Sequence, residues 1–124
     1  MITGAVNARN ELIVRLQLYD GTGQLQDIDA VIDTAFSEML ALPPADVARL
    51  GLPWFTQDRT VPADGTVYTL DVFLATLVWD GGARQVHVYA IGNSRLLGTG
   101  LLVGHDLRAR VEPGGAVEIE AIPP

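Results

Sequence analysis

A carboxylate follows directly after an apolar run in the segment AVIDTAFSEMLALPP, which spans residues 30–44. Asp33 comes immediately after Ala30-Val31-Ile32, where removing a charged group from water is expensive unless that group has a partner or a function. Two interpretations explain this placement. In the first, Asp33 caps a helix that starts at Ala35, with Glu38 adding favourable charge in its first turn. In the second, Asp33 is a catalytic acid held at the end of a strand.

Other residues that could bind a ligand or take part in a reaction lack the spacing that a metal or phosphate site needs. The sequence has no cysteine, so it offers no thiolate ligand and no disulfide. His87 and His105 have no ligand-spaced partner, and we expect each to face solvent or to bond locally rather than to hold zinc. The segment Leu96-Leu97-Gly98-Thr99-Gly100 lacks the lysine of a phosphate-binding loop, and its glycines do not have dinucleotide spacing. We interpret it as a packing turn, and we expect no cofactor and no metal.

The composition is typical of one globular domain, here spanning residues 1–124. There are 15 acidic residues against 8 arginines, with no lysine, and the net charge of −7 repels a phosphate backbone, so we expect no nucleic-acid partner. The longest apolar run, residues 72–79, is too short to span a bilayer. The N-terminal segment MITGAVNARN lacks the basic and apolar parts of a secretory signal. We therefore expect a soluble, cytoplasmic protein with no membrane partner.

Most of the chain has the period-two alternation of half-buried strands. Strands are predicted over residues 12–19, 25–32, 59–63, 66–77, 85–91, 107–112 and 116–122. Asp64-Gly65 predicts a tight type I′ hairpin, since both central residues of that turn need positive φ, and Asp80-Gly81-Gly82 predicts a second hairpin. One short helix is expected over residues 43–51, with proline at its start and glycine after its end. The pattern predicts an all-β barrel or sandwich.

Three of these segments, taken in order, resemble the retropepsin-like aspartic proteases, in particular small single-domain prokaryotic relatives with the motif Asp-Thr-Gly-Phe. Val31-Ile32-Asp33-Thr34-Ala35-Phe36 is similar to the catalytic loop of that family, and the Asp64-Gly65 hairpin stands in the position of its flap. Leu96-Leu97-Gly98 is similar to the apolar-apolar-Gly element that packs beneath the loop. Ala35 stands where the family has glycine. The resemblance covers nearly the whole chain and implies an all-β, closed retropepsin-like acid-protease barrel with one or two short helices.

The resemblance also implies an aspartic endopeptidase that acts on a peptide or protein substrate as a homodimer. Two copies of Asp33, one from each subunit, would share a proton and activate a water molecule. Thr34 would hydrogen-bond across the two-fold axis and fix the two loops relative to one another. Substrate would contact Ala35 and Phe36 from the loop and Asp64 and Gly65 from the flap.

The chain ends are the dimer contact that the resemblance implies. A chain with one catalytic aspartate has no complete site until it forms a closed two-fold dimer. By analogy with the family, the strands near residues 2–6 and 116–122 are edges of an isolated subunit. Interdigitating them across the axis would remove those exposed edges.

Two alternatives to an active protease remain open from the sequence. The methyl group of Ala35 marks a catalytically weak or inactive homodimeric relative that acts as a peptide-binding module. In the other alternative the chain is an unrelated small β-barrel that binds an apolar ligand, and Asp33 is only a helix cap. Trp54, Phe55 and Trp79 are expected in the core or in the wall of a cleft, since large aromatic residues dominate both.

Overall fold

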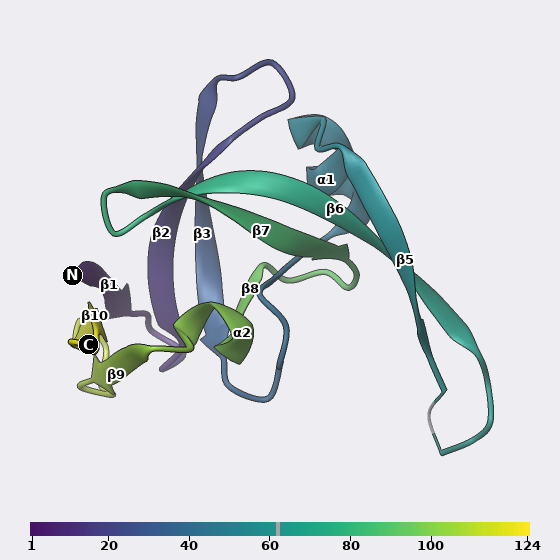
Figure 1. Ribbon diagram of the computed structural model, residues 1–124. Coiled ribbons are helices and arrows are strands. Elements are labelled where there is room, and N and C mark those ends of the chain that lie inside the picture. Colours follow the sequence, from purple (N-terminus) through teal and green to yellow (C-terminus); the bar gives the residue numbers. More distant parts are fainter. Residues whose placement is uncertain (62) are drawn as a thin grey trace.

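Figure 1 shows the computed structural model, which describes residues 1–61 and 63–124. Across these residues the chain forms a sheet of ten strands and two short helices. The strands are β1 (Ile2–Val6), β2 (Leu12–Tyr19), β3 (Leu25–Asp33), β4 (Leu40–Leu42), β5 (Trp54–Thr60), β6 (Tyr68–Trp79), β7 (Gly82–Ala90), β8 (Leu96–Gly98), β9 (His105–Ala109) and β10 (Ala116–Ala121). The helices are α1 (Pro44–Leu50) and α2 (Thr99–Leu102).

Six of the strands close into a barrel. Neighbouring strands follow the order β6-β7-β4-β8-β3-β2, and β2 then pairs with β6, where Leu18 lies opposite Leu77. β5 extends the sheet beyond β6, while β1, β10 and β9 extend it beyond β2. This arrangement confirms the predicted closed all-β barrel with one or two short helices.

Alternating side chains fill the barrel because successive strand residues point to opposite faces of the sheet. In β2, Val14, Leu16 and Leu18 are buried and the residues between them are exposed, as period two predicts. In β10, Val117 and Ile119 pack against the same core. Each fully buried aliphatic side chain stabilises the fold by about 1.5–3 kcal/mol. The alternation therefore decides which face of each strand turns inward.

Helix α1 forms where the sequence predicts a helix. Pro44 stands in its first turn, where a missing N–H leaves no bond unmade, and Gly51 ends the helix in the left-handed conformation at φ 63°. The Arg95 guanidinium donates to both carboxylate oxygens of Asp46, at 2.8 and 3.4 Å. This ion pair ties the connection before β8 to the helix.

The hairpin between β6 and β7 has the predicted two-residue turn. Asp80 and Gly81 have φ values of 50° and 83°, and Trp79 lies opposite Gly82 in the ladder. Both central residues thus have the positive φ that a type I′ turn requires.

The predicted tight hairpin at Asp64-Gly65 is wrong in its length. β5 ends at Thr60 and β6 begins at Tyr68, and of the two central residues only Gly65 has a positive φ, at 80°. The Asp64 carboxylate instead accepts a hydrogen bond from the Thr66 N–H at 2.9 Å, a local bond that stabilises a turn without positive φ at the aspartate. The predicted strand over residues 59–63 also includes Pro62, which lies outside the described residues.

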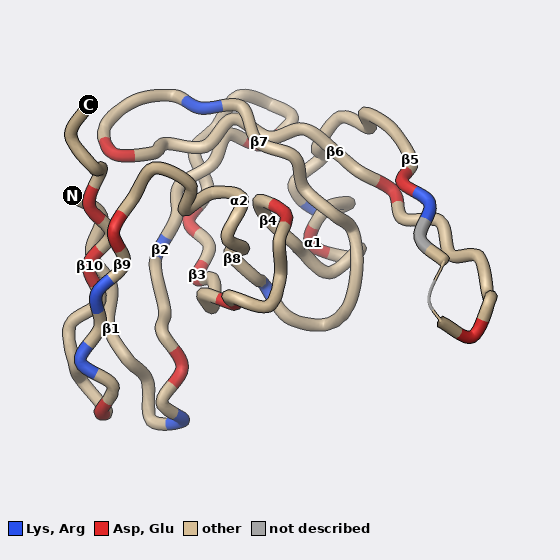
Figure 2. Tube along the Cα trace, turned by 60° about the horizontal axis from the view of Figure 1, so that its bottom comes forward, with Lys and Arg blue, Asp and Glu red and all other residues tan. Residues whose placement is uncertain are grey.

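The β5–β6 hairpin projects from the barrel as an arm in both views (Figures 1 and 2). Its residues Trp54 and Phe55 are 57% and 47% exposed, so they are not core residues, whereas Trp79 at 7% is. The Trp54 indole N–H donates to Asp71 at 3.1 Å, and Phe55 stacks on His87 with ring centroids 5.1 Å apart. The aromatic residues at the base of the arm therefore keep much of their surface in contact with water.

The expectation that the terminal strands are edges of an isolated subunit is wrong. β1 lies between β2 and β10, and β10 lies between β1 and β9. In the described part of the chain the free edges of the sheet are β5 and β9. The reason is the β9–β10 hairpin, because β9 covers the side of β10 that a single C-terminal strand would leave open.

Charged residues are spread over the molecule in Figure 2 without gathering into one basic face. Such a distribution gives no focused positive field for a phosphate backbone. Neither helix in the described residues is long and apolar enough to cross a membrane.

Candidate active site

Asp33 is the last residue of β3, at a point where this strand is held from both sides. On one side β3 pairs with β2, where Val31 lies opposite Ile13. On the other side it runs parallel to β8, where Asp33 lies opposite Gly98. The Val31 N–H also donates to the Arg95 C=O at 2.9 Å. The backbone leading to Asp33 is thus fixed by hydrogen bonds on both sides, while its side chain remains half-exposed.

The turn after β3 is organised by the carboxylate itself. The Ala35 N–H donates to Asp33 Oδ1 at 2.9 Å, and the Phe36 N–H donates to the Asp33 C=O at 3.1 Å. Residues 34–39 form turns and bends, and the next element is the strand β4. The interpretation of Asp33 as a helix cap is wrong, because no helix begins in these described residues.

The segment Leu96-Leu97-Gly98 packs against this loop, as predicted. The N–H groups of Gly98, Thr99 and Gly100 donate to the C=O groups of Met39, Phe36 and Glu38, at 2.9, 2.8 and 3.1 Å respectively. A Cβ atom on Gly98 would lie 2.1 Å from the Glu38 oxygen and 2.7 Å from the Phe36 oxygen, so only glycine permits this approach. The loop that carries Asp33 is therefore bonded to a distant segment mainly through its backbone, with one added bond from the Thr99 hydroxyl to the Phe36 C=O at 3.3 Å.

Ala35 is exposed and does not have a positive φ. Among the described non-glycine residues, a positive φ occurs at Asn10 and Asp80. Left-handed backbone is what makes alanine unfavourable at a glycine position, so the methyl group adds no backbone strain here. Alanine at this position changes the surface of the loop and not its conformation.

A pocket of about 410 Å³ opens beside Asp33. It is lined by Asp33, Ala35, Phe36, Ala41, Leu96 and the loop residues 91–94. Phe36 meets Tyr89 edge to face, with ring centroids 6.2 Å apart and planes at 86°, and this contact fixes the orientation of one wall. With a carboxylate at one side and mainly apolar groups elsewhere, the pocket suits an apolar side chain held next to an acid.

Tyr89 connects the pocket wall to the β5–β6 arm, and the sequence did not single it out. Its hydroxyl donates a hydrogen bond to the Asp58 carboxylate on β5. Burial raises the pKa of the Tyr89 hydroxyl above its ordinary value, and the bond to Asp58 raises it further. In the sequence this tyrosine has the pattern of any core aromatic residue, because its partner is 31 residues away.

The structure brings together only some of the predicted site residues. Asp33, Ala35 and Phe36 line one pocket, and Thr34 is exposed in the same turn. Asp64 and Gly65 lie in the connection between β5 and β6, and neither of them lines the pocket. In Figure 1 the connection is at the far end of the arm, away from the barrel.

The remaining polar candidates are engaged in local contacts. The Trp79 indole N–H donates to His105 Nε2 at 3.2 Å, and His105 Nδ1 lies 3.0 Å from the Val103 C=O. Asp29 forms an exposed ion pair with Arg15 at 3.0 Å. Among the residues that the structure describes, no group of three or more His, Asp or Glu side chains is placed to hold a metal ion.

A comparison with solved structures identifies the architecture. The chain matches a retropepsin-like aspartic protease from Rickettsia conorii with a TM-score of 0.58 and 17% sequence identity, over 98% of this chain and 91% of that chain. The fold is retropepsin-like. The high coverage means that the retropepsin-like fold includes the terminal strands and the arm as well as the barrel. No family model matches the sequence, and no curated protein matches it.

Proposed function

We propose that this protein is an aspartic endopeptidase of the retropepsin type that hydrolyses peptide bonds as a homodimer. The observation that carries the proposal is Asp33 at the end of β3, in a loop bonded to the segment around Gly98, within a retropepsin-like fold. One such aspartate per chain supplies half of a catalytic dyad. A second copy of the chain, related by a two-fold axis, completes it.

In the dimer the two Asp33 carboxylates lie side by side and share one proton, because two neighbouring carboxyl groups do not both ionise readily. The ionised carboxylate takes a proton from a water molecule as the water oxygen attacks the scissile carbonyl carbon. The protonated carboxyl group donates its proton to the carbonyl oxygen, which gives a tetrahedral diol. The C–N bond then breaks as one carboxyl group protonates the leaving nitrogen and a diol hydroxyl returns a proton to the other carboxylate.

The loop residues hold the reacting groups in place. The bond from the Ala35 N–H orients Asp33 Oδ1 and leaves the second carboxylate oxygen for water and substrate. Thr34, exposed in the turn, hydrogen-bonds its counterpart across the axis. The pocket beside Phe36 receives an apolar substrate side chain, and the arm brings Asp64 and Gly65 over the substrate as a flap.

A peptide-binding module with weak or no catalysis is the second candidate, and Ala35 is the observation that favours it. Its methyl group is exposed in the pocket beside Asp33, where substrate and the partner loop approach. A displacement of the scissile bond by ~1 Å lowers the rate on the order of a hundredfold. Such a displacement leaves the apolar pocket able to hold a peptide.

Turnover of a peptide library by the wild-type protein and by Asp33→Asn tests the proposal. Cleavage by the wild type and none by a folded variant supports the endopeptidase. Binding of peptides without cleavage by the wild type identifies the binding module. If the protein sediments as a dimer but neither cleaves nor binds any peptide, both candidates are rejected.

A further inference from the structure

We propose that the hollow between helix α1 and the base of the arm binds a small organic cation, in which an ammonium group is joined to an apolar body. This hollow, which we call the α1 hollow, has a volume of about 420 Å³, and small-molecule sites have volumes of this size. In Figure 1 α1 lies beside β5 and β6 where the arm leaves the barrel. The lining residues that carry the proposal are Val47, Ala48 and Leu52 on and after α1, Asp71 and Phe73 on β6, and Ala90 on β7.

The α1 hollow is separate from the pocket of the candidate active site. The two share no lining residue. Val72 and Tyr89 belong to the cluster that packs with Phe36 on the side of the active-site pocket. Phe73 and Ala90 follow them directly in β6 and β7, and successive strand residues point to opposite faces of the sheet. The α1 hollow therefore lies on the other face, and its ligand does not depend on the proposed peptidase activity.

Apolar side chains form most of the α1 hollow. Val47 and Leu52 are buried, and Phe73 and Ala90 are half-buried against the same core. Ala48 is exposed, and its small side chain leaves the hollow open to solvent. An apolar body that enters is removed from water, which favours binding without selecting a particular charge. The charge of the ligand has to be decided by the polar groups of the hollow.

Asp71 supplies a carboxylate that is held in a fixed orientation. Asp71 Oδ1 accepts hydrogen bonds from the Trp54 indole N–H and from the Gln57 side-chain amide, each at 3.1 Å. Trp54 lies opposite Phe73 in the ladder and Gln57 lies opposite Asp71, so these four side chains are on the same side of the sheet. Within the described residues, both of these bonds use Oδ1, and Oδ2 remains open to a ligand.

No arginine neutralises this carboxylate within the part of the chain that the structure describes. Arg49, on the helix that borders the hollow, pairs with Asp46 at 3.3 Å instead. An ammonium group would donate a charge-assisted hydrogen bond to Asp71 Oδ2. It would also lie beside the ring of Trp54, which is 57% exposed and is the aromatic side chain that attracts cations best. An anion would be repelled by Asp71 and by the net charge of −7.

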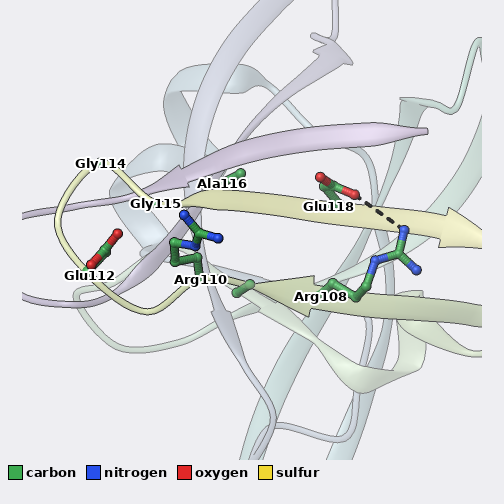
Figure 3. A pocket seen from close by; sticks show the side chains of 8 residues that line it. Arg108, Arg110, Glu112, Gly114, Gly115, Ala116 and Glu118 are labelled. Carbon is green, nitrogen blue, oxygen red and sulfur yellow. Dashed lines mark hydrogen bonds and ion pairs between the residues drawn. The ribbon is translucent and has the colours of Figure 1, made fainter.

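The hollow on the β9–β10 hairpin, shown in Figure 3, does not select one charge in this way. Its volume is about 370 Å³, and its charged lining residues have both signs: Arg108, Arg110, Glu112 and Glu118. Arg108 already donates to Glu118 at 3.3 Å and to Glu120 at 2.9 Å. An ion of either sign would meet repulsion as well as attraction there. The combination of an apolar wall with one uncompensated carboxylate belongs to the α1 hollow.

Titration with 2-phenylethylamine, followed by NMR, tests the site. The chain has two tryptophans, so the indole N–H signal of Trp54 is distinguished from that of the buried Trp79 by the variant Trp54→Phe. The Trp54 signal is expected to shift with a dissociation constant on the order of 1 mM or lower. 2-Phenylethanol has the same apolar body without the charge and should bind at least about tenfold more weakly. No saturation by about 20 mM amine, or equal affinity for the alcohol, overturns the proposal.

Asp71→Asn tests the role of the carboxylate. The amide oxygen can still accept from Trp54 and Gln57, while the negative charge is lost. The affinity for the amine is expected to fall at least about tenfold, and the affinity for the alcohol should stay within about twofold. Asp27→Asn makes the same change in net charge at an exposed position on β3 and is the matched control. Equal losses of amine binding in both variants would show a response to net charge alone and would overturn the site.

Ala48→Leu tests the position of the site by filling the hollow from its open side. Binding of the amine and of the alcohol should both weaken at least about tenfold. Ala45→Leu is the control, because Ala45 is exposed on the same helix and does not line the hollow. Leucine is a good helix former, so α1 is expected to form in both variants. Wild-type affinity in Ala48→Leu places the amine elsewhere and overturns the proposal.

Asp33→Asn separates this site from the proposed peptidase. Amine binding should stay within about twofold of the wild type in this variant, whether or not the wild type cleaves peptides. Cleavage that is absent while the amine still binds rejects the peptidase and leaves the cation site standing. Amine binding that is lost in Asp33→Asn places the amine in the active-site pocket and overturns the cation site. A blocked dipeptide of phenylalanine and lysine that binds at least about tenfold more tightly than the amine would identify a basic peptide segment as the occupant and would overturn the small-molecule ligand.

Discussion

The loop that carries Asp33 and the arm that carries Asp64 and Gly65 are held in opposite ways. Backbone bonds of 2.8–3.1 Å tie the Asp33 loop to the segment around Gly98, where a Cβ atom would collide with carbonyl oxygens. At Gly65, a Cβ atom would meet nothing within 4 Å. A reacting carboxylate needs fixed coordinates, whereas a segment that closes over substrate needs freedom to move. In the proposed peptidase, the bonds to the Gly98 segment would hold the reacting carboxylate, and the end of the β5–β6 hairpin would supply the segment that closes over substrate.

Replacing the carboxylate should have the largest effect. If the proposed dyad is correct, Asp33→Asn lowers kcat/KM at least about a thousandfold, because the amide cannot exchange the proton. The amide oxygen can still accept the Ala35 N–H, so the free energy of unfolding should change little. Asp27→Asn, on the solvated face of the same strand, is the control. Wild-type turnover by Asp33→Asn removes Asp33 from the mechanism.

Adding one methyl group to each region should separate the rigid loop from the open arm. Gly98→Ala forces the Glu38 carbonyl away and is expected to lower the free energy of unfolding by at least about 3 kcal/mol. Gly65→Ala has open space but a φ of 80°, and should lower it by about 1–2 kcal/mol. Urea denaturation of both variants measures the difference. Equal losses would show that the Asp33 loop yields as easily as the arm.

Cutting the bond between arm and barrel should have a moderate effect. Tyr89→Phe removes the hydroxyl that donates to Asp58 and is expected to lower the free energy of unfolding by about 1–2 kcal/mol. The Tyr89 hydroxyl also makes the free energy of unfolding of the wild type depend on pH in the alkaline range. Burial and Asp58 raise the pKa of Tyr89 above 10.0, so this stabilisation is complete below that pH and is lost as pH rises beyond it.

Urea titrations from neutral to alkaline pH measure this dependence. The chain has no lysine, so few other groups titrate in that range. The slope should be smaller in Tyr89→Phe than in the wild type. Identical slopes would mean that the Tyr89 hydroxyl is not the group being titrated.

The smallest change is Ala35→Gly, which makes the loop match the family motif. Ala35 has no positive φ, so glycine should lower the free energy of unfolding by about 0.4–1 kcal/mol through greater freedom of the unfolded chain. Removing the methyl from the cleft is nevertheless expected to raise kcat/KM at least roughly tenfold, or about 1.4 kcal/mol of barrier. Side-by-side assays at acid and neutral pH provide the measurement. Equal, substantial activity would show that the methyl is neutral.

The sequence by itself predicted most of the longer strands and which face of each turns inward, but not the short strands β4 and β8. Period two in β2 and the proline and glycine at the ends of α1 are local signals, and the structure follows them. For these features residue types at fixed positions were sufficient, because local backbone rules and burial decide them. The packing of Leu96-Leu97-Gly98 against the Asp33 loop was implied by the family resemblance instead, since it joins residues that are far apart in the sequence.

Only the tertiary structure decided which strands are edges, how long the connection between β5 and β6 is, and which residue accepts the hydrogen bond from the Tyr89 hydroxyl. β1 is an internal strand because β10 pairs with it, and that contact joins opposite ends of the chain. Asp64 forms a side-chain turn, which removes the need for the tight hairpin that Asp64-Gly65 predicts. Tyr89 finds Asp58 because β5, β6 and β7 are neighbours in the sheet. The β1–β10 pairing and the Tyr89–Asp58 bond join residues that are far apart in the sequence, and local sequence patterns do not encode which distant residues meet in the folded chain.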